Sequence, residues 1–181
     1  MKYNLSLRAS LLALLSLLLL TACEDPIDAT TQWRINNENA FNEYASKEDY
    51  TKASIEGSSA YVYMKWLAHG EGKEYPIETS RIKCHYEMRM LVGDKVVDGN
   101  YGSERPAQFA INRGAQDQLI EGARIGLQQM VVGDEAEIII PWYLGYGERR
   151  SGEINPYSAL KFRVKLEEII PESQRSVVAK D

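Results

Sequence analysis

Residues 119–147 constrain the fold more than any other stretch of this 181-residue chain. Apolar side chains recur at helical spacing in its first half and form one face of a helix: Leu119, Ile120, Ala123, Leu127 and Met130. The sequence Val-Gly-Asp-Glu at residues 132–135 then predicts a turn, and residues 136–140 predict a short strand rich in β-branched side chains. Because an apolar helix face needs a sheet to cover it, we expect helix, turn and strand to pack as one unit.

Two other segments alternate apolar and polar side chains with the period of a half-buried strand. In residues 82–90, and again in residues 160–167, the even-numbered positions form an apolar face and the odd-numbered positions are polar or charged. A further strand is expected over residues 61–67. Half-buried strands around one amphipathic helix predict an α+β domain, in which a curved antiparallel sheet wraps around that helix.

The first 22 residues are typical of an export signal. Lys2 and Arg8 precede the run LLALLSLLLL, which is too short for a membrane-spanning helix of about 20 apolar residues. The sequence Leu-Thr-Ala-Cys that ends at Cys23 fits the lipoprotein signal box, in which small residues precede the cysteine that becomes lipidated. An ordinary secretory signal followed by a chance cysteine is the alternative.

We therefore expect residues 1–22 to be a lipoprotein signal peptide and Cys23 to carry the lipid. A lipidated cysteine would anchor the protein to a membrane of the cell envelope. The expected location is the outer membrane, on its periplasmic face or at the surface.

The rest of the chain divides into a tether, a domain and a tail. Residues 23–57 are expected to be the lipidated tether, with a possible short helix within residues 39–52 and a few aromatic side chains that dock on the domain. A tether without such docking is the alternative. The domain is expected over residues 58–171 and the tail over residues 172–181. No sustained heptad pattern appears, so a monomer is expected.

Charge and side-chain chemistry exclude several classes of function. Removing Lys2 and Arg8 with the signal moves the formal net charge from −5 to −7, which does not suit a nucleic-acid partner. His85 lies on the polar face of its strand without a second ligand at metal spacing, so a surface histidine is expected. Cys84 lies on the apolar face, where a buried inert thiol is expected. The sequence therefore predicts no metal site, cofactor or nucleic-acid partner.

Several motifs, taken in order, carry a family resemblance. They are GEGKEYP (70–76), IKCHYEMRML (82–91), LIEG (119–122), IGLQQMVVGDEA (125–136), IIIPWYLGYG (138–147) and EINPYSALKFRVKLEEI (153–169). Their order and spacing resemble the FK506-binding-protein (FKBP) family of peptidyl-prolyl isomerases over most of the mature chain. The resemblance implies the strand order of that family and an apolar pocket that catalyses rotation about X-Pro bonds. That reaction requires no nucleophile or metal.

The resemblance also implies a set of site residues. Those matching catalytic positions are Tyr86, Asp98, Tyr146 and Phe162, with Tyr146 donating to the substrate carbonyl. Those matching the walls of the proline pocket are Val97, Phe109, Leu119, Ile120, Ala123 and Ile154. From periodicity alone, Tyr86, Phe109 and Phe162 would instead be ordinary core residues.

Some positions depart from the family pattern. Ala123 stands where the family often has a tryptophan floor, Val97 replaces a loop aromatic, and Ala107 replaces a wall phenylalanine. Two hypotheses follow. The chain is an isomerase that acts on proline-containing unfolded or exported polypeptides and assists their folding. Alternatively, it is a binding or chaperone module that keeps the fold with weak or no catalysis.

Overall fold

The computed structural model describes residues 27–112 and 114–171 of the chain. The expected signal peptide at residues 1–22, the lipidation site Cys23 and the tail at residues 172–181 lie outside the described residues. Among the helices of the two described ranges, none has the length and apolar character needed to cross a membrane.

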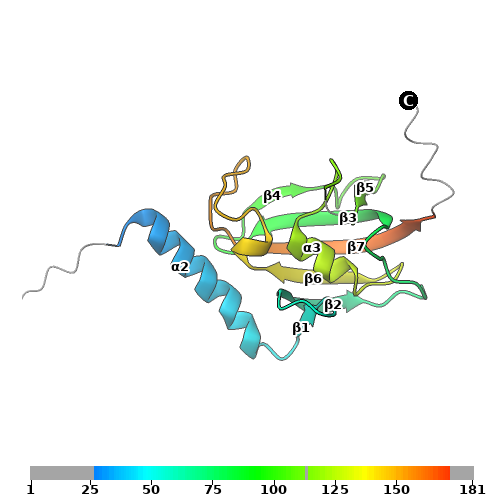
Figure 1. The fold of residues 1–181 in the computed structure, drawn as a ribbon, viewed down its shortest axis with the longest axis horizontal. Helices are drawn as coiled ribbons and strands as arrows, with labels where there is room; N and C mark the ends of the chain where they lie inside the picture. Colours follow the sequence, from blue (N-terminus) through cyan, green and yellow to red (C-terminus); the bar gives the residue numbers. More distant parts are fainter. Residues whose placement is uncertain (1–26, 113, 172–181) are drawn as a thin grey trace, which may run out of the picture.

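A seven-stranded antiparallel sheet forms the frame of the domain (Figure 1). Its strands are β1 (Thr51–Ser54), β2 (Tyr61–Ala68), β3 (Arg81–Met90), β4 (Val96–Gly99), β5 (Ala107–Ala110), β6 (Glu135–Ile140) and β7 (Leu160–Ile170). Neighbouring strands follow the order β1-β2-β6-β7-β3-β4, and β5 pairs with β3.

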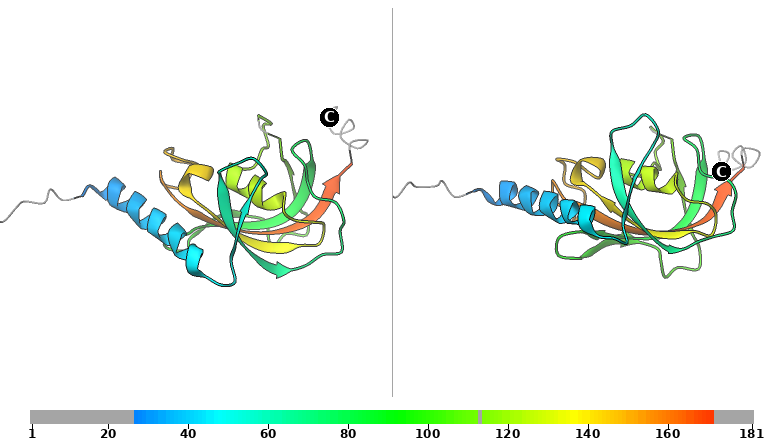
Figure 2. Two further views of the ribbon diagram at one scale, coloured as in Figure 1. Left: turned by 60° about the horizontal axis from the view of Figure 1, so that its bottom comes forward. Right: turned by 90° about the horizontal axis from the view of Figure 1, so that it is seen from below.

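Two helices, α2 (Ala29–Asn42) and α3 (Glu121–Leu127), and two short 3-10 turns, η1 (Glu43–Ser46) and η2 (Trp142–Leu144), accompany the sheet. Figure 2 shows the sheet curving around α3, whereas α2 lies at one end of the sheet and outside this concavity. The predicted α+β architecture, a curved antiparallel sheet around one main helix, is therefore confirmed.

Helix α3 lies close to β6 because two of its residues are glycines. A Cβ atom on Gly122 would lie 2.3 Å from Cγ2 of Ile140, and one on Gly126 would lie 2.3 Å from Cδ1 of Ile138. Because these glycines are four residues apart, they lie on the same face of α3, and their missing side chains leave room for Ile138 and Ile140 of β6. Six of the seven residues of α3 are buried, so the helix is enclosed on more sides than the single apolar face expected. It is also shorter than expected, since Met130 lies in the segment that follows.

The predicted alternation in β3 and β7 is confirmed. Over residues 82–90 and 160–166, the even-numbered side chains face the interior and are buried or half-buried, and the polar and charged side chains between them face outward. The register places Met88 opposite Phe162 and Tyr86 opposite Val164. This register fixes which aromatic side chains meet on the inner face of the sheet.

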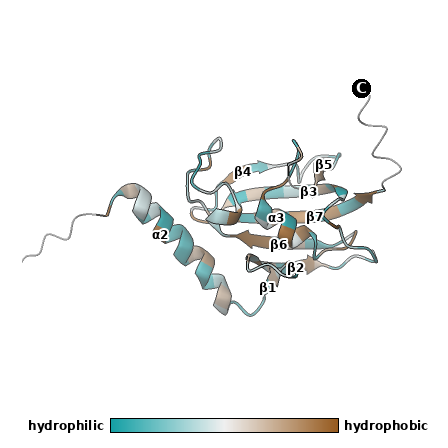
Figure 3. Cartoon of the chain, viewed as in Figure 1, coloured by the Kyte–Doolittle hydropathy of each residue, from teal (hydrophilic) through white to brown (hydrophobic). Residues whose placement is uncertain are grey.

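The N-terminal region contains a longer helix than the sequence predicts. Oδ1 of Asp28 accepts hydrogen bonds from the backbone N–H groups of Thr30 and Thr31 at 2.9 and 3.0 Å, and this cap sets the start of α2. The short helix expected within residues 39–52 is present as the last turn of α2 and the η1 turn, and α2 begins ten residues earlier, at Ala29. Figure 3 shows α2 as largely hydrophilic, which explains why periodicity gives it so little signal.

The segment after α2 belongs to the sheet. Strand β1 pairs with β2 and forms an edge of the sheet, although it precedes the domain boundary expected at residue 58. At the end of α2, the ring of Phe41 lies 5.8 Å from the ring of Tyr61 and 5.1 Å from that of Tyr63, measured between centroids. Phe41 is 3% exposed, so the aromatic side chains of this region dock on the sheet.

Candidate functional site

Tyr86 is the centre of an aromatic cluster on the inner face of the sheet. Its ring is stacked against that of Phe162 and meets that of Phe109 edge-on, each at a centroid distance of 5.4 Å. Its hydroxyl group donates a hydrogen bond to Oδ2 of Asp98 at 2.9 Å. The other carboxylate oxygen of Asp98 accepts from the N–H of Gly99 at 2.8 Å. Strands β3, β4, β5 and β7 thus bring four of the predicted site residues together.

The carboxylate of Asp98 affects the pKa of two tyrosines, Tyr86 and Tyr146. Burial, together with the hydrogen bond to Asp98, raises the pKa of Tyr86 well above the usual tyrosine value. Burial and the charge of Asp98 also raise the pKa of Tyr146. Tyrosine phenols are protonated at neutral pH in any case, and the raised pKa values extend to higher pH the range in which these two act as hydrogen-bond donors. Since Asp98 influences both groups, Tyr86 and Tyr146 belong to one electrostatic environment.

Tyr146 comes from the loop that follows β6. Pro141 starts the η2 turn, and the N–H of Gly147 then donates to the carbonyl of Trp142 at 3.0 Å, which turns the chain and fixes the backbone beside Tyr146. The Tyr146 ring is half-buried and packs against the core. Among the described residues, no group hydrogen-bonds to the Tyr146 hydroxyl. That donor is free for a bound ligand.

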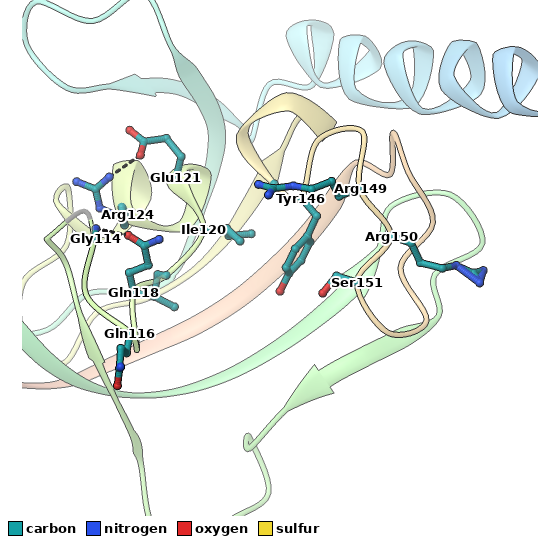
Figure 4. Close-up of a pocket in the computed structure, with 12 residues that line it drawn as sticks. Gly114, Gln116, Gln118, Ile120, Glu121, Arg124, Tyr146, Arg149, Arg150 and Ser151 are labelled. Carbon is teal, nitrogen blue, oxygen red and sulfur yellow. Dashed lines mark hydrogen bonds and ion pairs between the residues drawn. The ribbon is translucent and has the colours of Figure 1, made fainter.

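A cleft of about 790 Å³ lies in front of Tyr146. Figure 4 shows the Tyr146 ring projecting into it between Ile120 and Ser151. The cleft includes three predicted site residues (Leu119, Ile120 and Tyr146). Its remaining lining comes from residues that the sequence analysis does not name as site residues: Gly114, Gln116, Gln118, Glu121, Arg124, Gly145, Arg149, Arg150 and Ser151. It is more polar than the apolar slot that the resemblance implies.

Comparison with known proteins identifies this arrangement. Residues 72–167 match the model of the FKBP-type peptidyl-prolyl cis-trans isomerase family. The chain belongs to this family. An FKBP-type 22 kDa peptidyl-prolyl cis-trans isomerase of Escherichia coli is 33% identical over 125 residues, which are 68% of this chain and 57% of the relative. A probable FKBP-type isomerase of Neisseria meningitidis, FkpA, is 32% identical over 124 residues, 68% of this chain and 43% of the relative. The chain thus spans about half the length of these two relatives.

Solved structures show the same fold. A crystal structure of a peptidyl-prolyl isomerase from Pseudomonas syringae has a TM-score of 0.65 and 23% identity, covering 80% of this chain and 98% of that one. The crystal structure of Escherichia coli FkpA also has a TM-score of 0.65, with 24% identity, covering 77% of this chain and 60% of that one. The FKBP fold of the described residues is therefore shown.

The remaining expected pocket residues of this FKBP-type domain lie in or against the same core. Val97 and Phe109 are half-buried and pack on it, and Ile154 is 4% exposed. Ile154 and Ser151 exchange backbone hydrogen bonds of 2.9 and 3.1 Å, which hold the late loop in a tight turn. Ala123 is fully buried. The small side chain at the floor position therefore leaves no opening to solvent there.

Arg124 is a residue of the FKBP-type cleft that sequence reasoning missed. Its side chain is 3% exposed, donates hydrogen bonds to the carbonyl of Ile111 and to Glu121, and lies 3.7 Å from Oε1 of Glu78. A buried arginine requires such partners, because an unpaired buried charge is costly. The one-face helical pattern could not reveal it, since α3 is enclosed on several sides. The available signal was a charged residue next to Ala123 in an apolar helix.

Two arginines at the rim of the FKBP-type cleft were also missed. Nη2 of Arg150 donates to Oδ1 of Asn155 at 2.6 Å. Among the described residues, no carboxylate forms an ion pair with Arg149 or Arg150. Figure 4 shows Arg149 reaching across Tyr146 towards Ile120 and Arg150 pointing outward. The rim thus carries uncompensated positive charge, although the chain as a whole is acidic.

The other candidate groups lie outside this site. Cys84 is fully buried, and burial raises the pKa of its thiol to about 12, so the expected inert thiol is confirmed. His85 lies on the outward face of β3, as expected, but it is only 17% exposed, with Nδ1 2.9 Å from Oε1 of Glu167 and Nε2 3.1 Å from the carbonyl of Ser103. In the two described ranges, no group of three or more acidic, histidine or cysteine side chains could hold a metal ion.

Proposed function

We propose that this FKBP-type domain is a peptidyl-prolyl cis-trans isomerase acting on proline-containing unfolded or exported polypeptides. One observation carries the proposal. The Tyr146 hydroxyl, which has no hydrogen-bond partner among the described residues, belongs to the cleft, and Tyr86 and Asp98 of the aromatic cluster interact electrostatically with Tyr146. A hydrogen-bond donor next to buried aromatic surface is what a proline-containing peptide segment requires.

The chemistry needs no covalent step. Rotation about an imide bond has a barrier of about 18–20 kcal/mol that arises from amide resonance, and the twisted transition state has lost that resonance. A site that binds the twisted imide better than the planar one lowers the barrier by about 1.4 kcal/mol for each tenfold in rate. Aromatic walls accept the proline ring and exclude water, and Tyr146 donates to a substrate carbonyl.

Asp98 has a supporting role in this proposal. It accepts the hydrogen bond of Tyr86 at 2.9 Å and so fixes the orientation of that ring beside Phe162. Burial and the negative charge of Asp98 also raise the pKa of Tyr146. Removing the carboxylate would therefore affect two of the site's tyrosines at once.

The proposed setting is the cell envelope. It rests on the sequence of residues 1–23, where Cys23 would be lipidated and would anchor the protein to a membrane, with the outer membrane as the expected location. The proposed form is a monomer with no metal or cofactor, and no nucleic-acid partner is expected for an acidic chain.

The test is isomerase activity of the chain without its signal and lipid, on proline tetrapeptides and on a protein whose refolding is limited by proline isomerisation. Tyr146→Phe should lower kcat/KM roughly two- to tenfold, the value of one hydrogen bond. Tyr143→Phe is the matched control, because Tyr143 is 52% exposed and lies outside the cleft lining. Asp98→Ala should lower kcat/KM further. A folded domain that accelerates neither reaction would exclude the isomerase.

The polar cleft keeps the second hypothesis open. Ala107 and Ala123 replace larger residues of the family pattern, and Arg149 and Arg150 add charge at the rim. These features favour a binding or chaperone module over efficient catalysis. Such a module would bind proline peptides and prevent aggregation of an unfolded protein, without accelerating either isomerisation reaction.

A further inference from the structure

Helix α2 lies outside the part of the chain that the family model matches. That match covers residues 72–167, whereas α2 ends at Asn42. Yet α2 contacts the segment at residues 141–159, which joins β6 to β7 and carries Tyr146 and Ile154. The family match therefore assigns no role to α2, although this helix packs against the loop that carries Tyr146.

Asn37 makes the most buried of these contacts. It is fully buried in the middle of α2. Its Oδ1 accepts a hydrogen bond from the N–H of Ala159 at 2.9 Å, and its Nδ2 donates to the carbonyl of Trp33 at 2.9 Å. The carbonyl of Ala159 in turn accepts from the N–H of Leu91 at 2.8 Å. A buried amide with both ends satisfied fixes the last residue of the loop before β7 begins.

Two further residues of α2 contact the segment. Oε1 of Glu38 accepts a hydrogen bond from the indole N–H of Trp142 at 3.1 Å, at the start of the segment. Near its end, the indole N–H of Trp33 donates to Oγ of Ser158 at 3.3 Å. Trp33 and Asn37 are four positions apart and share a face of α2, and Glu38 follows Asn37 directly, so α2 reaches both ends of the loop.

The loop also contains a strained residue between these anchors. Tyr157 has a φ of +60°, a left-handed conformation that a bulky side chain rarely adopts. Its N–H donates to the carbonyl of Gly147, next to Tyr146, at 2.8 Å. The guanidinium of Arg34 lies 5.7 Å from the centroid of the Tyr157 ring. Such strain persists only where the surroundings hold it, and α2 is part of those surroundings.

We propose that α2 is a positioning element of the site and that Asn37 is its principal positioning residue. By holding Ala159 and the turn around Tyr157, it keeps the loop in the conformation that presents Tyr146 to the cleft. The expected change in KM rests on the proposed isomerase function. The expected change in amide exchange of the loop can be measured without any substrate.

The test compares Asn37→Ala with Asn39→Ala, the same change at an exposed position of the same helix. Amide hydrogen exchange at Tyr157 and Ala159 should rise about tenfold or more in Asn37→Ala, while exchange at Val164 in β7 stays unchanged. Asn37→Asp keeps an acceptor for the N–H of Ala159 but places a carboxyl group at a fully buried position, so protection should return at a pH low enough to keep that group neutral. Asn39→Ala should behave as wild type.

The kinetic arm separates positioning from loss of stability. If the loop samples wrong conformations, the apparent KM should rise about tenfold with kcat nearly constant, because only a fraction of the folded protein binds substrate. Irreversible loss of folded protein would instead lower the apparent kcat and leave KM unchanged, and reversible global unfolding would raise amide exchange at Val164 as well. Trp33→Phe replaces Asn37→Ala in this test if Asn37→Ala does not fold. It keeps an aromatic ring but removes the donor to Ser158, and it should raise exchange and KM in the same direction by a smaller amount.

Each outcome decides the proposal. Wild-type exchange at Tyr157 in a folded Asn37→Ala variant would overturn it, and so would raised exchange with wild-type KM. If wild type has no isomerase activity, the proposed function fails separately. The exchange data still judge the loop contact, and the affinity for a proline peptide then replaces KM.

Discussion

The two faces of the sheet are stabilised by different interactions, although the same strands build both. On the inner face, the side chains of Phe162, Val164 and Leu166 are almost fully buried against α3 and the core. On the outer face, ion pairs link neighbouring strands: Lys83 with Glu168 at 2.7 Å and Arg163 with Glu135 at 2.7 Å. The outer face is apolar and buried where Phe41 of α2 covers Tyr63 and Ile139, so the contrast applies to the part of that face away from α2.

The difference is expected from the surroundings of each face. Burying an aromatic side chain removes a large apolar area from water, whereas ion pairs between partly exposed groups contribute about 0–1 kcal/mol each. The inner face should therefore account for most of the free energy of unfolding. It is also where burial raises the pKa of the tyrosine hydroxyls of the site.

The largest predicted effect is on the inner face. Phe162→Ala should lower the free energy of unfolding by about 3–5 kcal/mol, because the ring is 2% exposed and leaves a cavity. The neighbouring Arg163→Ala on the outer face should cost about 1 kcal/mol or less. Urea unfolding followed by fluorescence measures both. Equal losses in the two variants would contradict the contrast between the faces.

The second prediction concerns the contact between α3 and the inner face. Gly122→Ala should lower the free energy of unfolding by about 1–3 kcal/mol, although alanine favours helices, because its Cβ would lie 2.3 Å from Cγ2 of Ile140. Gly102→Ala is the control, since no atom lies within 4 Å of the added Cβ there. A stabilised Gly122→Ala variant would mean that α3 can move away from β6 without cost.

The inner face was also the part that could be predicted from the sequence. Period-two alternation identified β3 and β7, because a half-buried strand must alternate. The family resemblance then supplied residues that lie together in the structure, such as Tyr86, Asp98 and Phe162. Periodicity tells which face of an element is buried, and on the inner face that information is nearly sufficient.

The sequence could not predict which segments cover a face of the sheet, or which partners hydrogen-bond to a buried polar side chain. Arg124 is buried because Ile111 and Glu121 accept from it, and neither partner is fixed by helical spacing alone. The extent of α2 depends on a cap at Asp28 and on a buried Asn37, whose partner Ala159 is distant in sequence. Polar contacts of this kind are long-range and leave no periodic signal.

The third prediction uses the hydrogen bond between Tyr86 and Asp98. Tyr86→Phe should lower the free energy of unfolding by about 0.5–1.5 kcal/mol at neutral pH. Because burial and Asp98 raise the pKa of Tyr86 in the folded state, its contribution is complete below about pH 10, the unfolded value, and is lost as pH rises further. The decline of stability at alkaline pH should therefore be shallower in Tyr86→Phe. Tyr75→Phe, at a 58% exposed position, should show neither effect.

The smallest predicted effect is on the outer face, and it has the opposite dependence on pH. Burial raises the pKa of Glu167, but hydrogen bonds from His85 and Lys165 outweigh burial and leave the pKa below its usual value. A lowered folded-state pKa adds stability that is present above the unfolded value of about 4.5 and lost as pH falls below it. Glu167→Gln should cost less than about 1 kcal/mol at pH 7, because the side chain is 27% exposed.

Urea unfolding between pH 3 and pH 7 tests this prediction, with the slope of stability against pH as the measured quantity. The slope below about pH 4.5 should be shallower in Glu167→Gln than in wild type. About 1 M salt should flatten the wild-type slope as well, because it screens the charges of Lys165 and His85. Identical slopes in the two proteins would show that this ion pair is neutral to folding. The outer face would then contribute even less than its contacts suggest, and the contrast with the inner face would be sharper.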